Sequence, residues 1–311
     1  MQTKTILTLT LNPSVDVHTE AETVQPERKL RCTEPLQEPG GGGINVARAI
    51  HKLGGRATAM FASGGRNGET LAELIDREEI ESLAIRVEGE TRENFHVYER
   101  SSGRQYRFIM PGTALSSSDA DHMLETLAQL EPAPSFIVAS GSLPSSVPSD
   151  YYARLCSKLS DSSARVVVDT SGDALRQSLG EGLFLIKPTL GEFRKLVDRE
   201  LADDREIEHA ARALIDEGKV ENLLISLGSA GALFVTADGS TRISSPTVRI
   251  VSTVGAGDST VAGLILGLAR DLDPADAARF GIAAGAAAVM TPGTELCRRE
   301  DAERLFDAMP R

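Results

Sequence analysis

The sequence predicts a layered α/β fold with a mostly parallel central sheet, and two observations carry this prediction. Short apolar runs recur along the chain and are bounded by Gly, Ser or Pro, and segments between them place apolar residues at helical spacing. Such alternation indicates βαβ units, and strands that are apolar on both faces are typical of parallel sheets covered by helices. With 311 residues, 41% of them hydrophobic, we expect a single domain over 1–311.

Each element follows from its local pattern. The expected strands are Thr5–Leu11, Ala57–Ser63, Phe136–Ser140, Val166–Asp169, Phe184–Lys187 and Leu223–Leu227. The expected helices are Ile44–Leu53, Glu69–Glu78, Asp119–Leu130, Asp150–Leu159, Gly191–Val197, Arg205–Glu217, Asp258–Arg270 and Pro274–Met290. The Ala-rich part of the last helix is too short to span a bilayer and contains Arg279, so we expect a buried helix.

Two extended segments interrupt this alternation, at about 14–36 and 90–110. The second contains F-H-V-Y-E-R and Q-Y-R-F-I-M around a Ser-Gly turn, which indicates a β-hairpin. We expect the two segments to form a small β-sheet lid inserted in the α/β core. A plain edge extension of the main sheet is the alternative.

Composition excludes several function classes. The net charge of −12 argues against general binding to nucleic acid or a membrane surface, because both need an extended basic face. Cys32, Cys156 and Cys297 are scattered without metal-binding or paired spacing, which fits a reducing cytoplasm. The N-terminus has no secretory pattern. A small anionic substrate would need a local basic cluster.

The most specific motif is T-V-G-A-G-D-S at 253–259, just before an apolar-periodic helix. Small residues at Gly255, Ala256 and Gly257 let backbone N–H groups approach a ligand and form an anion hole. Asp258 beside them is placed to accept the proton of an attacking hydroxyl. An Asp that merely caps the helix is the alternative.

A glycine quartet, Gly40 to Gly43, precedes a second helix that carries Asn45. The string lacks the third glycine of a dinucleotide-binding G-x-G-x-x-G turn, and the chain contains no Walker A motif. A flexible loop before a helix is the alternative.

Other candidate ligands for a phosphorylated sugar lie nearby in the sequence. Asp16 follows the first strand, where it can accept hydrogen bonds from hydroxyls or cap a turn. Lys29 and Arg31 are two residues apart, so on a strand they would point to one face and, with Arg92, would form a cationic pocket. A solvated charged strand is the alternative.

These strings, in this order from Leu9 to about Cys297, resemble the ribokinase-like, or PfkB-type, carbohydrate kinases. The resemblance implies a ribokinase-like α/β/α domain with a β-sheet lid, and ATP and Mg²⁺ as cofactors. It implies that Asp258 is the catalytic base and that Gly255, Ala256 and Gly257 form the anion hole. Gly42 stands where related 1-phosphofructokinases and tagatose 6-phosphate kinases usually carry Lys, which favours the 6-phosphofructokinase branch and fructose 6-phosphate as substrate. Kinases for those other sugar phosphates, and a non-catalytic sensor, remain alternatives.

The resemblance also implies roles around the sugar. Lys29 would lie near the transferred phosphate, Arg92 would hold the substrate phosphate, and Arg31 would reach across a homodimer interface formed by the lids. The remaining substrate-binding residues implied are Asp16, Gly40, Gly41, Gly42, Gly43, Asn45, Ser140, Gly141 and Ser142.

For the nucleotide and metals, the resemblance points to the C-terminal half. Glu192 would organise Mg²⁺ through water, with Thr189 in place of the usual Asn. The resemblance also implies a site for K⁺ near the anion hole. There Thr291 and Glu295 depart from the Asn and Arg of the nearest relatives. The nucleotide-binding residues implied are Lys187, Thr189, Ser226, Gly228, Ser229, Gly231, Val254 and Val289, and the K⁺ site residues are Ser252, Val254, Ala288, Thr291 and Gly293.

Overall fold

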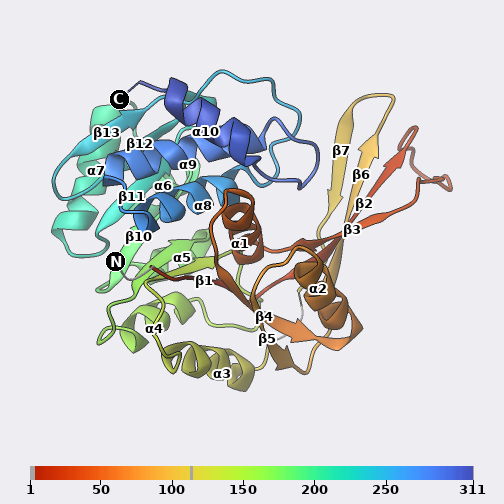
Figure 1. Cartoon of the computed structure of the whole chain (residues 1–311), viewed down its shortest axis with the longest axis horizontal. Helices are drawn as coiled ribbons and strands as arrows, with labels where there is room; N and C mark the ends of the chain where they lie inside the picture. Colours follow the sequence, from red (N-terminus) through yellow and green to blue (C-terminus); the bar gives the residue numbers. More distant parts are fainter. Residues whose placement is uncertain (1–3, 113–114, 311) are drawn as a thin grey trace.

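The computed structural model describes residues 4–112 and 115–310. A large sheet is covered by helices on both faces, and a second, smaller sheet projects from one end of the molecule (Figure 1). The expected layered α/β domain with a β-sheet lid is confirmed. The ends of the expected domain, Met1 to Thr3 and Arg311, lie outside the described residues.

The large sheet is parallel except at one edge, where β11, β12 and β13 pair antiparallel. Chain order runs outward in both directions from the neighbouring strands β1 and β8, which makes their carboxyl ends the switch point where α/β sheets bind ligands. From edge to edge the strands are β13 (Ser240–Ile243), β12 (Ala232–Val235), β11 (Asn222–Ser226), β10 (Leu183–Ile186), β9 (Arg165–Asp169), β8 (Phe136–Ser140), β1 (Ile6–Thr10), β4 (Thr58–Gly64) and β5 (Ser82–Val87).

Two hydrophobic cores hold the helices to the sheet. Alternate strand residues point to opposite faces: Phe136 and Val138 pack in one core, Ile137 and Ala139 in the other. The first core takes α1 (Gly42–Lys52), α2 (Gly65–Arg77), α8 (Ala256–Ala269), α9 (Pro274–Ala288) and α10 (Arg299–Ala308). The second takes α3 (Ser117–Ala128), α4 (Tyr151–Lys158), α5 (Gly172–Ser178), α6 (Leu190–Val197) and α7 (Asp204–Asp216).

The lid is built from two chain segments that are far apart in sequence. Its central strands β2 (Ser14–Ala21) and β6 (Arg92–Glu99) pair in parallel, and β3 (Leu36–Gly40) and β7 (Arg104–Phe108) flank them antiparallel. The expected β6–β7 hairpin is present. The first lid segment extends beyond the expected limit at 36, because β3 continues to Gly40.

Among the helices and strands of the described residues, β5, β12, β13, α5 and α10 fall outside the predicted set. The strands β5 and β13 lie at the edges of the sheet, where one side is exposed and the apolar pattern is weak. The Ala-rich helix α9 is buried along Ala277–Ala288, as expected. Within residues 4–112 and 115–310, no helix combines the length and apolar character needed to cross a bilayer.

Candidate active site

Two helix N-termini meet above the carboxyl edge of the large sheet. Helix α8 begins after Gly255, whose φ of 73° places it in the left-handed region, and Asp258 lies in its first turn. Helix α1 begins after Gly41, and its Asn45 donates from Nδ2 to Asp258 Oδ2 at 3.0 Å. The structure therefore joins the glycine quartet and the T-V-G-A-G-D-S motif in one site.

The environment of Asp258 raises the pKa of its carboxyl group to about 7. Burial is the largest cause, and the neighbouring Asp169 carboxylate acts in the same direction. The hydrogen bond from Asn45 and the positive charges of Lys187 and Arg48 oppose the increase. A carboxylate with this pKa exchanges protons near neutral pH, as a general base requires.

Asp169, which the sequence analysis did not select, pairs with Lys187 beneath this site. Asp169 ends β9, and Lys187 follows β10, the strand that pairs in parallel with β9. Lys187 Nζ lies 3.2 Å from Asp169 Oδ1. Burial, the largest single cause, lowers the pKa of Lys187, but the charge and hydrogen bond of Asp169, together with the charges of Asp258 and Glu192, raise it above its ordinary value. Lys187 Nζ also lies 3.5 Å from where a Cβ on Gly257 would be, so a fixed positive charge faces the start of α8.

The first turn of α8 offers backbone donors to an anion. The first N–H groups of a helix have no acceptor within the helix, and the helix dipole favours negative charge there. At Gly255 a Cβ would lie 2.4 Å from Leu296 Cδ2, so the tight turn excludes a side chain. Gly255, Ala256 and Gly257 therefore lie at the start of α8, with Asp258 in the first turn, where a helix can accept an anion.

Close packing explains the glycine quartet. A Cβ on Gly40 would lie 2.4 Å from Asp16 Oδ2, and one on Gly42 would lie 2.5 Å from Ser140 Oγ. A Cβ on Gly43 would lie 2.5 Å from Thr10 Oγ1, and Gly41 has a φ of 119°. The quartet thus packs the start of α1 against the ends of β1 and β8, at the switch point of the sheet.

The loops after β1 and β8 are also joined there. Asn12 Nδ2 donates to Ser142 Oγ at 3.1 Å. The Gly141 carbonyl accepts a hydrogen bond from Thr170 Oγ1 at 2.9 Å, which anchors the loop that carries the exposed Ser142. The structure therefore brings the S-G-S string to the same edge as the glycine quartet.

Asp16 lies on the inner face of the lid. Its Oδ1 accepts hydrogen bonds from Ser14 Oγ at 2.7 Å and from Asn94 Nδ2 at 2.9 Å. These bonds orient the carboxylate and leave Oδ2 pointing toward Gly40. Asn94 was missed by the sequence analysis, although it lies two residues after Arg92 in the T-R-E-N string.

Arg92 begins β6 at the base of the lid. Its guanidinium donates to the carbonyls of Asn12 at 3.0 Å, Met110 at 3.2 Å and Pro13 at 3.4 Å. Burial lowers the pKa of Arg92, with the Asp16 charge opposing this effect. The carbonyls fix the side chain where the lid leaves the core, close to the ends of β1.

Lys29 and Arg31 lie elsewhere. Both are exposed and belong to residues 22–35, where Cys32 alone bridges to Ala21, so the expectation that they share a strand face was wrong. Residues 22–35 follow the end of β2, whereas Arg92 pairs with Ser14, the first residue of β2. Eight strand residues separate the two ends, about 23 Å at 3.3 Å per residue. Within one chain, Lys29 and Arg31 do not form a pocket with Arg92.

Six of the eight predicted nucleotide residues lie at or just after the ends of β10 and β11, whereas Val254 precedes α8 and Val289 follows α9. Thr189 caps α6: its hydroxyl and backbone N–H donate to Glu192 Oε2, both at 2.8 Å, and Glu192 N–H donates back to the hydroxyl at 3.2 Å. Thr189 also forms a bridge with Ser226 of β11. The turn after Ser226 contains the exposed Gly228 and Ser229 and the buried Gly231, with φ values of 61° at Gly228 and 101° at Gly231.

Two loops meet beside the start of α8 and contain the predicted K⁺ site residues. Ser252 Oγ donates to the Gly293 carbonyl and accepts from the Val254 N–H, both at 3.2 Å. The backbone of Val251 donates to the Val289 carbonyl at 2.7 Å. Thr291 is buried, and its hydroxyl donates to the carbonyls of Ala288 and Leu296 at 2.8 Å.

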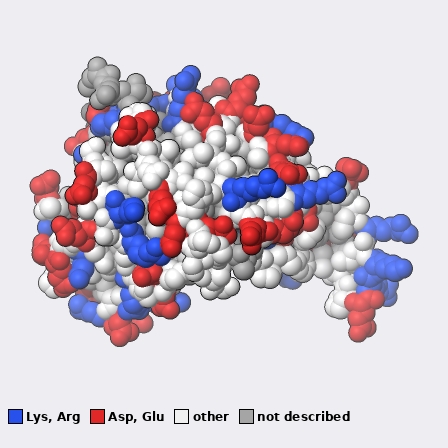
Figure 2. All heavy atoms as spheres, turned by 90° about the horizontal axis from the view of Figure 1, so that it is seen from below, with Lys and Arg blue, Asp and Glu red and all other residues white. Residues whose placement is uncertain are grey.

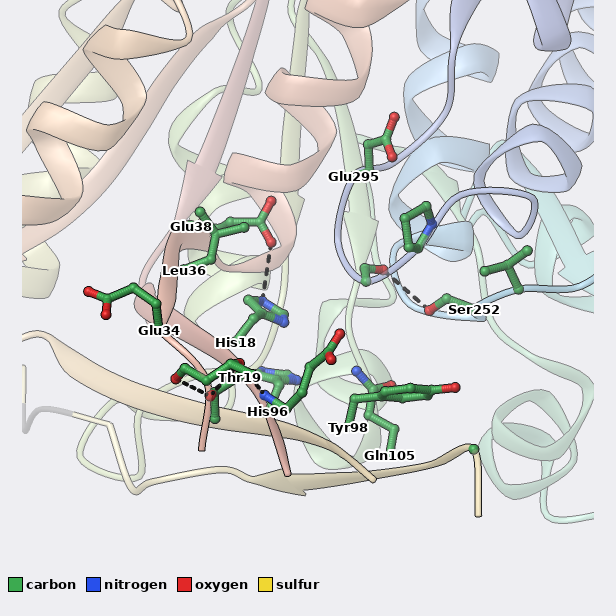
Figure 3. Close-up of a pocket in the computed structure, with 16 residues that line it drawn as sticks. His18, Thr19, Glu34, Leu36, Glu38, His96, Tyr98, Gln105, Ser252 and Glu295 are labelled. Atoms are coloured by element: carbon green, nitrogen blue, oxygen red, sulfur yellow. Dashed lines mark hydrogen bonds and ion pairs between the residues drawn. The ribbon is translucent and has the colours of Figure 1, made fainter. Parts of the chain in front are cut away.

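A cavity of about 810 Å³ lies between these loops and the inner face of the lid (Figure 3). Lid residues His18, Leu36 and His96 line it on one side, and Ser252 and Glu295 on the other. The sequence analysis selected neither histidine, because single histidines in strands carry no spacing signal. Asp258 is not among the residues that line this cavity.

Comparisons with known proteins agree with this geometry. The pfkB family carbohydrate kinase pattern matches residues 10–301. The chain is 43% identical over 302 residues to ATP-dependent 6-phosphofructokinase isozyme 2 of Mycobacterium tuberculosis, which covers 97% of this chain and 89% of that protein. It is 42% identical over 307 residues to the isozyme of Escherichia coli, covering 98% and 99%. Identity to 1-phosphofructokinase of Bacillus subtilis is lower, 32% over 294 residues, covering 93% and 95%.

Solved structures show the same fold. The crystal structure of E. coli phosphofructokinase-2 in complex with fructose-6-phosphate superposes with a TM-score of 0.93 at 40% identity, covering 99% of this chain and 100% of that one. The potassium complex of the same enzyme gives 0.94 at 41% identity, covering 98% and 99%.

The three-layered α/β domain with its lid, and the carboxylate beside a helix N-terminus, define a kinase that phosphorylates a hydroxyl group. The chain belongs to the pfkB family of carbohydrate kinases.

Proposed function

We propose that this protein transfers the γ-phosphoryl group of ATP to the C1 hydroxyl of fructose 6-phosphate, giving fructose 1,6-bisphosphate. The observation that carries the proposal is Asp258, a carboxylate with a pKa of about 7 next to an anion-binding helix start. The identity of 42–43% to two ATP-dependent 6-phosphofructokinases, against 32% to a 1-phosphofructokinase, favours the 6-phosphate substrate.

In this proposal Asp258 accepts the proton of the attacking hydroxyl, while Asn45 orients the carboxylate through its 3.0 Å hydrogen bond. The backbone at Gly255–Gly257 and the charge of Lys187 stabilise the negative charge that develops on the transferred phosphoryl group. Because the Asp169 partner fixes Lys187, that charge is positioned before the substrate arrives.

The sugar would bind at the switch point, under the lid. Gly40–Gly43 bring backbone close to the ends of β1 and β8, where a side chain would block the approach, and Asp16 Oδ2 is free to accept from a sugar hydroxyl. Ser140, Gly141 and Ser142 border the same space. Arg92, at the base of the lid, would hold the 6-phosphate through charge-assisted hydrogen bonds.

Mg²⁺ and K⁺ fit the residues present. Glu192 is oriented by its cap on Oε2, and its other oxygen can accept from a water of Mg²⁺, which neutralises phosphate charge when bound. In this proposal Thr189 acts as the N-cap of α6 and does not replace the side-chain amide of the usual Asn. The loops at 252–254 and 288–293 supply carbonyl oxygens suited to K⁺. The carbonyl oxygen of Ala288 already accepts a hydrogen bond from the Thr291 hydroxyl.

A homodimer through the lids would complete the site. Phe95 and Phe108 lie opposite each other on β6 and β7, on the lid face away from Asn94 and His96, and they are 37% and 48% exposed. Figure 2 shows basic side chains grouped at the projecting end of the molecule. Two lids that pack through the phenylalanines would carry Lys29 and Arg31 toward the partner's sugar phosphate.

Coupled measurement of ADP release with a panel of sugars tests the proposal. Turnover should require fructose 6-phosphate, with tagatose 6-phosphate, fructose 1-phosphate and free fructose much weaker, and the product should carry its new phosphate on C1. Preference for another sugar phosphate would reassign the substrate. Saturable sugar-phosphate binding without ADP release would indicate a sensor.

A further inference from the structure

Two histidines of the lid stack beside Asp16 at the inner end of the cavity. His18 comes from β2 and His96 from β6, at paired positions in the register. Their ring centroids are 4.6 Å apart and their planes differ by 22°. Figure 3 shows both rings under the Glu38 carboxylate, facing the cavity. None of the proposed steps of phosphoryl transfer uses either ring.

His96 is buried, with 5% of its surface exposed, and among the described residues neither ring nitrogen has a hydrogen-bond partner. A buried polar group without a hydrogen-bond partner lowers the free energy of unfolding. We therefore expect a ligand at this site that a lone pair of a ring nitrogen can bind. Burial, the largest cause, lowers the pKa of His96 even though Asp16 opposes it. The unpartnered nitrogens of His96 lie beside His18 and Asp16, so an ion between these three side chains would give one of them a partner.

The Asp16 carboxylate next to the rings is oriented by hydrogen bonds to one of its two oxygens. Ser14 and Asn94 occupy Oδ1 of Asp16, while Oδ2 lies 3.9 Å from His96 Nε2. Asp16, His18 and His96 each place one ligand atom within 4.8 Å of the other two. Carboxylates and imidazoles that converge in this way form a usual protein ligand set for zinc.

The outer neighbours also fit such a site. Glu38 Oε2 lies 3.3 Å from His18 Nε2, and Arg48 contacts the same carboxylate at 3.4 Å. A carboxylate on the remote side of a ligating histidine fixes the ring and increases its basicity. Thr294 adds a hydroxyl donor to Glu38.

We propose that Asp16, His18 and His96 bind a divalent transition-metal ion of the Zn²⁺ class, with an open coordination position toward the cavity. Zinc bonds of about 2.0–2.2 Å require ligand atoms closer than they now lie, so the rings turn toward Asp16 on binding. The imidazoles select against Mg²⁺, which prefers oxygen ligands, so this site is separate from the one that serves the nucleotide.

Occupation of the site has a consequence that rests on the proposed function. The metal takes Oδ2 of Asp16, the oxygen proposed to accept from a sugar hydroxyl. Zn²⁺ should therefore inhibit competitively with fructose 6-phosphate, and chelation should restore the rate.

The direct test measures metal binding without substrate. The full chain with Cys32→Ser, to remove its exposed thiol, is stripped with a chelator and dialysed against Zn²⁺ in competition with a chromophoric chelator. His18→Ala is compared with His209→Ala, which removes an exposed histidine on α7. We expect one tight site in the parent and in His209→Ala, and at least tenfold weaker binding in His18→Ala with an unchanged melting temperature. Equal affinities in all three proteins would overturn the proposal.

Co²⁺ gives a second readout that does not depend on turnover. The parent should show the intense visible absorption of a four- or five-coordinate Co²⁺ site, and His18→Ala and His96→Gln should lose it. Absorption that persists in a folded His18→Ala would also overturn the site. Tight Zn²⁺ binding in a protein that fails to phosphorylate fructose 6-phosphate would refute the proposed function and leave the metal site standing.

Discussion

At the scale of single residues, the proton affinity of Asp258 is set by neighbours from three parts of the chain: α1, the end of β9 and the residue that follows β10. Burial and Asp169 raise the pKa of the carboxyl group, while Asn45, Lys187 and Arg48 limit the increase. The balance leaves the group near half-ionised at pH 7, so its carboxylate form is both available and basic enough to accept a proton.

Replacing Asp258 with Asn keeps the shape of the side chain and removes the base. We expect turnover to fall by about 10²–10⁴-fold, with ATP affinity and melting temperature little changed. Steady-state kinetics and thermal unfolding check this expectation. A variant that retains near-normal turnover would remove Asp258 from the role of base.

The pH profile follows from the same carboxyl group. Because the pKa is raised, protonation inactivates the base as the pH falls, so kcat/KM should decline below about pH 7. The Asp169→Asn variant loses a negative charge that repels the Asp258 carboxylate, and Lys187 loses the partner that competes with Asp258 for it. The pKa of Asp258 should therefore fall, and the acidic limb of the pH profile should move to lower pH. A limb that stays in place in this variant would contradict the influence of Asp169.

Arg92 is expected to act on substrate binding rather than on chemistry. Arg92→Ala should lower kcat/KM for fructose 6-phosphate by about 10–100-fold, equivalent to a charged hydrogen bond of about 1.5–3 kcal/mol. The effect should appear in KM, with the KM for ATP unchanged. A loss confined to kcat would argue that Arg92 serves the transferred phosphate instead.

At the scale of elements, the ends of β1 and β8 and the start of α1 are packed so tightly that backbone alone fits between them. Gly42 is the clearest case, because a Cβ there would lie 2.5 Å from Ser140 Oγ and 2.8 Å from the Gly141 backbone nitrogen. The geometry of the sugar site therefore depends on how closely α1 approaches the loop after β8.

Gly42→Ala should push these elements apart. We expect a loss of about 1–3 kcal/mol in the free energy of unfolding and a higher KM for the sugar. Gly191→Ala is the matched control, since no atom lies within 4 Å of a Cβ there and Gly191 is helical. Chemical denaturation of both variants checks the prediction, and equal stabilities would contradict the close approach.

The sequence predicted most strands and helices because their apolar patterns are local. It also singled out Asp258 and Asn45 as candidate site residues, because each follows a glycine-rich string at a helix start, and the structure brings the two side chains into contact. The Asp169–Lys187 pair, and the stacked His18 and His96, were missed because they depend on which strands become neighbours. Lys29 and Arg31 were placed wrongly for a related reason: an alternating pattern indicates a strand, but here the segment bridges at Cys32 alone.

At the scale of the whole molecule, the lid exposes apolar surface on the side away from the cavity. Phe95 is 37% exposed and Phe108 48%, and the two lie opposite each other on β6 and β7. Clustered exposed apolar side chains of this kind mark protein interfaces, and here they support the proposed lid-to-lid dimer.

Phe108→Asp should weaken this dimer. We expect the variant to elute as a monomer in size-exclusion chromatography at micromolar concentration, while the parent elutes as a dimer. If Arg31 reaches across the interface, the monomer should also have a raised KM for the sugar. His122→Asp, an exposed substitution on α3, should change neither property. A parent protein that is monomeric at all concentrations would contradict the proposal.

The parallel pairing of β2 with β6 has a consequence for how the chain folds. Ser14 lies beside Arg92, a separation of 78 residues, and the intervening chain forms α1, β4, α2 and β5. Closing so large a loop costs entropy that only a formed core can offset. The lid should therefore assemble after the central strands and open before them, and its amides should exchange with deuterium well before those of β1 and β8.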